Sequence, residues 1–231
     1  MGLFEMEQVK ILSTLASSFG MRVLIGLEEK GLKYEYQEED LLTKKSDLLL
    51  QLNPVHKKLP VFIHNGQPIC ESLIILQYTD ETWDSKQLLP SKPYDRALAR
   101  FWADFIDKKF FDSALRIVLS KDEDQEQAKR EMLESLKALE GALNEMSGGG
   151  SLPFFNGKDF GFLDIAFIPF ASWFHTFESM GNFKLPFESE YPLLDAWVKR
   201  CMERESVKKA LPSPDRVLEY ALQLRKKYLV N

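Results

Sequence analysis

Apolar and polar residues follow two different patterns along this chain, and the change falls near residue 84. Before it, short apolar or alternating runs typical of strands are interleaved with stretches of helical periodicity. The predicted strands cover residues 9–13, 32–38 and the runs KLPVFIH and QPICE; the predicted helices cover 18–30, 46–53 and 71–83. Asn65-Gly66, between the last two strands, is a strong hairpin signal. The order β-α-β-α-β-β-α predicts a mixed sheet covered by helices.

Beyond residue 84 the strand patterns stop. Residues 84–94 are polar and contain two prolines, which indicates a linker. Apolar residues at four-residue spacing then predict one long helix over 94–119. Further predicted helices cover 122–146, 163–179 (bent at Pro169), 191–204 and 214–227, with a glycine-rich loop over 147–161. We therefore expect an α/β domain over residues 1–83 and an all-α domain over 95–231.

Composition narrows the class of protein. The 231 residues are 45% hydrophobic, and the net charge of −5 argues against a nucleic-acid partner. No apolar run approaches the roughly 20 residues that span a bilayer, and the N-terminus lacks the basic start of a secretory leader. Cys70 and Cys201 lie far apart, and the three histidines form no cluster, so we expect neither a disulfide framework nor a metal site. These features predict a cytoplasmic, globular protein.

Two serines mark the junction of the first strand with the first helix, in the stretch LASSFGMRV. A helix N-terminus presents free N–H groups and a partial positive charge, and a hydroxyl there can donate a hydrogen bond to an anion. The more common use of serine at this place is simply to cap the helix. Taken alone, Ser17 and Ser18 are better explained as capping residues.

Two later stretches raise the same choice between structure and chemistry. In KLPV, a cis Leu59-Pro60 bond would expose the backbone of Leu59 at a sheet edge, where a peptide could pair; an ordinary trans edge proline is the alternative. In CESLIIL, Ser72 could offer a hydroxyl and an N–H to a carboxylate, and Glu71 could accept from an ammonium; first-turn capping is the alternative.

Together these features predict a particular ligand. The two serines, the edge proline and the Glu71-Ser72 pair all stand at the ends of elements of one small sheet. Lys45 and the pair Lys57-Lys58 could hold a second carboxylate. The ligand they describe has an amine, two carboxylates and a peptide-like middle, and glutathione fits that description.

The chain also resembles a known family over essentially its whole length. It is similar to the soluble glutathione transferases, and within them to the plant tau class. The stretches that carry the resemblance are LASSFGMRVLIGLEEKGLKYEY, NPVHKKLPVFIHNGQPICESLIILQYTDE, LLPSKPYDRALARFWADFIDKK, FFNGKDFGFLDIAF and WVKRCMERESVKKALP. The resemblance implies a thioredoxin-like N-terminal domain that holds glutathione, a helical domain that supplies the electrophile pocket, and a homodimer.

The family pattern also implies roles for individual residues. Its Ser-Pro-Phe element reads Ser17-Ser18-Phe19 here, which makes Ser17 the catalytic candidate and places Ser18 where proline is usual. The implied glutathione-binding residues are Ser17, Ser18, Lys45, Lys58, Leu59, Glu71 and Ser72, with Pro60 in the cis form. A serine rather than a cysteine at position 17 favours conjugation over thiol transfer. Glutathione is then a co-substrate, and neither a cofactor nor a metal is expected.

For the electrophile pocket we expect Leu15, Phe111, Leu115, Trp173 and Phe177. Aromatic residues at helical spacing are more often core, and this alternative holds for each of them, least for Trp173, which matches a pocket position of the family. Leu15 stands where the family often has tryptophan. Asp164 resembles the family's helix-capping aspartate, and its predicted role is structural.

The predicted function is that of a glutathione S-transferase acting on hydrophobic electrophiles such as xenobiotics, with the thiolate stabilised by a serine hydroxyl. Two alternatives stay open at this point. One is a ligandin, which carries apolar ligands with little catalysis, and the other is a glutathione-dependent peroxidase acting on organic hydroperoxides.

Overall fold

The structure, a computed structural model, describes residues 8–229. The N-terminal residues 1–7, in which we expect no leader, lie outside this range. The chain divides into two compact units, the first ending at Lys86 and the second beginning at Gln87.

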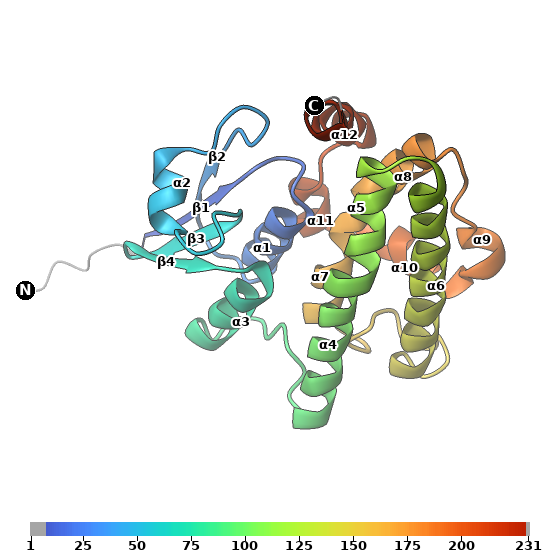
Figure 1. The fold of residues 1–231 in the computed structure, drawn as a ribbon. Coiled ribbons are helices and arrows are strands. Elements are labelled where there is room, and N and C mark those ends of the chain that lie inside the picture. Colours follow the sequence, from blue (N-terminus) through green and yellow to red (C-terminus); the bar gives the residue numbers. More distant parts are fainter. Residues whose placement is uncertain (1–7, 230–231) are drawn as a thin grey trace, which may run out of the picture. The chain divides into compact units, whose positions relative to one another are not determined.

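The first unit contains one four-stranded sheet (Figure 1). Its strands are β1 (Val9–Ser13), β2 (Glu35–Glu38), β3 (Val61–His64) and β4 (Gln67–Cys70), in the order β2-β1-β3-β4. β2 runs parallel to β1, whereas β3 is antiparallel to β1 and to β4. At the β3–β4 turn, Asn65 and Gly66 both have positive φ, 49° and 79°, as the hairpin signal predicts. The predicted mixed sheet and its hairpin are confirmed.

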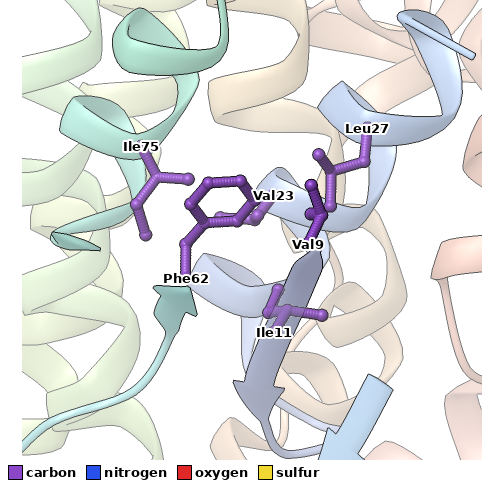
Figure 2. Close-up of a cluster of buried hydrophobic side chains, with 6 residues drawn as sticks. All are labelled: Val9, Ile11, Val23, Leu27, Phe62 and Ile75. Atoms are coloured by element: carbon purple, nitrogen blue, oxygen red, sulfur yellow. The ribbon is translucent and has the colours of Figure 1, made fainter. Parts of the chain in front are cut away.

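Alternation along β1 distributes apolar side chains to the two faces of the sheet. Figure 2 shows Val9, Ile11 and Phe62 on one face, packed against Val23 and Leu27 of α1 and Ile75 of α3. Helix α1 spans Ser18–Glu29 and α3 spans Ser72–Thr82. On the other face, Leu12 and Val61 pack with Leu49 of α2 (Asp47–Leu52). Both faces are therefore covered by helices.

In the part that the structure describes, the second unit consists of helices joined by loops, with an isolated bridge between Phe154 and Gly157. Its helices are α4 (Pro93–Phe105), α5 (Phe111–Leu119), α6 (Asp122–Met146), α7 (Phe162–Phe167), α8 (Phe174–Gly181), α9 (Phe187–Glu190), α10 (Pro192–Met202), α11 (Glu205–Ala210) and α12 (Pro214–Leu229). A π-helical segment, Ile106–Phe110, joins α4 to α5. The predicted long helix over 94–119 is thus one helical run whose hydrogen-bond register widens in the middle.

A cluster of aromatic rings forms the core of the helical unit. Phe110 meets Phe167 edge to face, with ring centroids 5.2 Å apart, and Phe167 stacks on Trp197 at the same separation. Asp164 is buried beneath them and accepts hydrogen bonds from Trp197 Nε1 at 2.7 Å, and from the N–H groups of Phe155 and Gly161 at 3.0 Å. It caps the start of α7, which is the structural role predicted for it.

Two predicted elements need correction. The strand predicted over 32–38 is only β2, Glu35–Glu38, because residues 32–34 make no ladder. The helix predicted over 163–179 is not one bent helix, since a 3₁₀ segment, Ile168–Trp173, separates α7 from α8. Pro169 lacks the N–H that an α-helix needs there. The short helices α9 and α11 were not predicted.

Candidate active site

The strand ends that lie next to the candidate residues meet at one end of the sheet. Leu12, near the end of β1, pairs with Val61 at the start of β3, and Val61 pairs with Cys70 at the end of β4. Ser13 pairs with Glu38, the last residue of β2. The register therefore places the Ser17 loop, Pro60 and the Glu71-Ser72 pair along one edge of the N-terminal unit.

Ser17 is the N-cap of α1. Its Oγ accepts a hydrogen bond from the Gly20 N–H at 3.1 Å, and its carbonyl accepts one from Met21 N at 2.9 Å. The hydroxyl oxygen is the acceptor in this bond, so the hydroxyl hydrogen remains available as a donor. Within residues 8–229 it is donated to no residue. The side chain is half-buried at the positive end of the helix. Capping and donation to an anion are thus compatible in one residue.

Ser18 has a different position. It is the first residue of α1 and is buried, with 5% of its surface exposed. The prediction that Ser18 begins the helix is confirmed. A glutathione contact by Ser18 stays a prediction.

The residues just before β3 offer a free stretch of backbone, but the prediction of an edge strand was wrong, because β3 lies between β1 and β4 inside the sheet. The Leu59–Pro60 peptide bond is cis, as the resemblance implies. Within residues 8–229, no hydrogen bond uses the N–H or C=O of Leu59. The preceding turn is held by the buried Asn53, whose Nδ2 donates to the Lys58 carbonyl at 2.9 Å and whose Oδ1 accepts from His56 N at 3.1 Å. The side chain of Lys58 is exposed beside it.

Glu71 and Ser72 stand where β4 passes into α3. Glu71 has φ 71° and ψ 113°, a region that residues other than glycine seldom occupy, and its side chain is exposed. Ser72 opens the helix, where the first N–H groups lack partners within the helix. Its Oγ accepts a hydrogen bond from Nη1 of Arg22 at 3.3 Å, and Arg22 is fully buried. A buried cation therefore stands behind the hydroxyl predicted to meet a carboxylate.

Lys45 lies just before α2 and is exposed. The next residue, Ser46, caps α2 by accepting from Leu49 N at 3.0 Å. The backbone next to Lys45 is therefore held by the capped start of α2.

The residues predicted for the electrophile pocket are divided between the two units. Leu15 lies in the Ser17 loop of the first unit. In the second, Phe111 is the first residue of α5, with its ring 6.2 Å from that of Phe170, and Leu115 is 37% exposed one turn later. Trp173 stacks on Phe177 at 5.9 Å, and Phe177 is buried with 2% exposure. The structure thus brings Trp173 and Phe177 together, with Phe177 on the core side.

Three residues of this region were not predicted. Arg22 interrupts an apolar helix face, a signal that could have been used. Asn53 precedes a proline and looked like an ordinary helix end. Glu38 lies at the exposed end of β2, and no pattern in the sequence distinguishes it from a solvated charge.

Across residues 8–229, no group of three or more histidine, cysteine or acidic side chains could hold a metal ion. Within the same range, no helix is both long and apolar enough to cross a membrane.

Comparison with known proteins identifies the family. Residues 7–81 match the model of the glutathione S-transferase N-terminal domain, and residues 95–205 match that of the C-terminal domain. The chain therefore belongs to the glutathione S-transferases, and its first unit is the thioredoxin-like domain of that fold.

Plant relatives define the class. The probable glutathione S-transferase parC of Nicotiana tabacum is 54% identical over 96% of this chain and 97% of its own length. Glutathione S-transferase U19 of Arabidopsis thaliana is 52% identical over 96% of this chain and 98% of its own length. The tau-class enzyme of mango superposes with a TM-score of 0.88 at 42% identity, covering 94% and 98% of the two chains. Rice GST1, solved with glutathione, superposes with a TM-score of 0.85 at 43% identity, covering 97% of this chain and 99% of its own. The chain is thus a tau-class glutathione S-transferase.

Proposed function

We propose that this enzyme binds glutathione at the edge formed by the Ser17 loop, Leu59 and the start of α3, and that Ser17 holds the glutathione sulfur as a thiolate. The observation that carries the proposal is the geometry of Ser17. Its oxygen accepts from Gly20 N at 3.1 Å, so the hydroxyl is oriented while its hydrogen stays available.

The thiolate needs stabilisation because a free thiol has a pKa near 8.5 and is mostly protonated at neutral pH. A hydrogen bond from Ser17 to the thiolate is charge-assisted, and the N-terminus of α1 adds its partial positive charge. Each unit of pKa depression corresponds to about 1.4 kcal/mol. A depression of roughly one to two units is within reach of these two interactions.

The other candidate residues match the remaining groups of glutathione. Ser72 and the first N–H groups of α3 suit one carboxylate, and the exposed Glu71 suits the ammonium. The backbone of Leu59, which has no hydrogen-bond partner among residues 8–229, suits the peptide-like middle. Lys45 and Lys58, both exposed, suit the second carboxylate.

In the proposed reaction the thiol proton leaves to solvent, and a sulfur lone pair forms the new bond to an electrophilic carbon. Where the electrophile carries a leaving group, that group departs with the electrons of its broken bond. Ser17 acts only as a hydrogen-bond donor and forms no covalent bond. Holding both reactants in one site supplies much of the remaining rate enhancement.

We place Leu15, Phe111, Leu115 and Trp173 against the electrophile, with Phe177 supporting the Trp173 ring from the core. Aromatic and aliphatic side chains that are only partly buried are suited to hydrophobic substrates. We further propose a cytoplasmic homodimer, as the family resemblance implies; gel filtration at several protein concentrations tests the dimer.

Conjugation of an aryl halide tests the proposal. Ser17→Ala should lower kcat by at least about tenfold, since one pKa unit of thiolate stabilisation is tenfold in equilibrium. Glutathione binding, measured by calorimetry, should change much less. Ser18→Ala, one residue away, is the control: it should keep kcat near the wild-type value, and any effect of a lost glutathione contact should fall on KM for glutathione. Full activity of Ser17→Ala with loss in Ser18→Ala would reverse the assignment, and dye binding without turnover in the wild type would favour a ligandin.

A further inference from the structure

Glu38 connects the end of β2 to the loop that carries Ser17. It is the last residue of the strand and pairs in register with Ser13, the last residue of β1. The following N–H, of Glu39, donates to the Ser13 carbonyl at 2.7 Å. β2 is therefore paired with β1 up to Ser13, where the loop begins, and the side chain of Glu38 contacts the first two residues of the loop.

Three donors converge on the Glu38 carboxylate. Oε1 accepts from the Leu15 N–H at 2.9 Å and from Thr14 Oγ1 at 3.0 Å, while Oε2 accepts from the Tyr36 hydroxyl. Burial, with the adjacent Glu38 carboxylate adding to it, raises the pKa of Tyr36, so the phenol keeps its proton and remains a donor. Hydrogen bonds to an ionised acceptor are stronger than those between neutral groups.

These contacts lead directly to Ser17. The Ser17 N–H donates to the Thr14 carbonyl at 2.9 Å. Thr14 therefore donates through its hydroxyl to Glu38 and accepts through its carbonyl from Ser17. Leu15, whose N–H Glu38 holds, lies between them. The loop is thus fixed at two successive residues by one carboxylate.

We infer that Glu38 is a positioning residue for Ser17: it holds Thr14 and Leu15 so that the Ser17 hydroxyl meets the glutathione sulfur. The inference rests on the proposed role of Ser17. A displacement of about 1 Å at a reacting group can cost as much as a hundredfold in rate, so a loop anchor away from the chemistry can control turnover.

The test compares three variants of the full-length enzyme in aryl halide conjugation. Glu38→Ala should lower kcat about tenfold and raise the apparent pKa in the pH dependence of kcat/KM, with KM for glutathione within about twofold. Glu38→Gln should recover most of the rate, because its amide oxygen can accept from both Leu15 and Thr14. Glu35→Ala is the matched control: Glu35 lies on the same strand and pairs with Lys10 at 2.9 Å, away from the loop.

A double-mutant cycle separates this inference from the role of Ser17 itself. If Glu38 acts through Ser17, adding Glu38→Ala to Ser17→Ala should cost almost nothing further. A loss that persists undiminished in the Ser17→Ala background overturns the inference while leaving the role of Ser17 intact. Wild-type activity in Ser17→Ala would instead contradict the proposed function.

If Glu38→Ala does not fold, Thr14→Val replaces it. This variant keeps the shape of a side chain that is 7% exposed and removes one donor to Glu38. It should lower kcat severalfold and raise the same apparent pKa. An unchanged kcat and pH profile in Thr14→Val, or a loss in Glu35→Ala equal to that in Glu38→Ala, overturns the inference.

Discussion

The Ser17 hydroxyl shows how one group can serve structure and chemistry together. As an acceptor from Gly20 N it fixes the start of α1, and this leaves the hydrogen as its only donor. Ser18 is buried within the first turn. The sequence alone presents two equivalent serines, and the difference between them arises from where the helix begins.

Asp164 is the residue whose ionisation should affect stability most visibly. Burial raises the pKa of this carboxyl to about 6, although Trp197, Gly161 and Phe155 donate to it and lower it in part. The native state then holds a proton that the unfolded chain releases at its ordinary pKa of 3.8. The free energy of unfolding should therefore fall as pH rises from about 4 to about 6, by an amount on the order of 3 kcal/mol.

Urea unfolding of the wild type and of Asp164→Asn, at fixed protein concentration between pH 4.5 and about 7.5, checks this sign. Asparagine does not titrate, so any stability advantage of the wild type over the variant should shrink as pH rises through the window. An advantage that grows with pH would mean that the N–H donors outweigh burial and hold the pKa of Asp164 below its ordinary value.

The elements of the N-terminal unit depend on close approach at one glycine. An ideal Cβ placed on Gly20 would lie 1.8 Å from Oγ and 3.0 Å from Cβ of Ser13, so β1 and the start of α1 leave no room for a side chain. Rotation of Ser13 could move its Oγ but not its Cβ. Gly20 thus sets how near the Ser17 loop lies to the end of β1.

Gly20→Ala should lower the stability of the enzyme by about 1–3 kcal/mol, the usual cost of overpacking. Gly141→Ala is the matched control: Gly141 also lies within a helix, and nothing is within 4 Å of its added Cβ. That change should stabilise the protein by about 0.5–1 kcal/mol through helix propensity. Thermal and urea midpoints measure both, and equal effects in the two variants would contradict this account of Gly20.

Most elements were predictable because their signals are local. A short apolar run predicts β1, alternation predicts β2, helical periodicity predicts α1, α3 and α6, and Asn65-Gly66 predicts the hairpin of β3 and β4. Other features depend on packing that a local pattern does not contain. The four-residue helix α9 is too short to show a period. The positive φ of Glu71 could not be predicted either, because the residue there is not glycine.

The candidate site could be predicted in part for the same reason. Ser17, Glu71 and Ser72 stand at element ends that the pattern locates, and the resemblance assigns them roles. Glu38 acts across strands, through a carboxylate that meets a loop 23 residues earlier in the chain. Only the pairing of β1 with β2 reveals that contact, and no local pattern in one sequence contains it.

The similarity to known enzymes covers both units of the chain. The matches to the N-terminal and C-terminal domain models, and to tau-class relatives at about half identity, assign the class. At this scale, the proposed function depends on stabilisation of the glutathione thiolate by Ser17.

Ultraviolet titration of enzyme-bound glutathione measures that chemistry, because the thiolate absorbs where the thiol does not. In the wild type the bound thiol should titrate roughly one to two pKa units below the free value near 8.5. In Ser17→Ala the pKa should return most of the way towards that free value, while Ser18→Ala should behave as the wild type. A bound thiol in Ser17→Ala that titrates at the wild-type pKa would contradict the account.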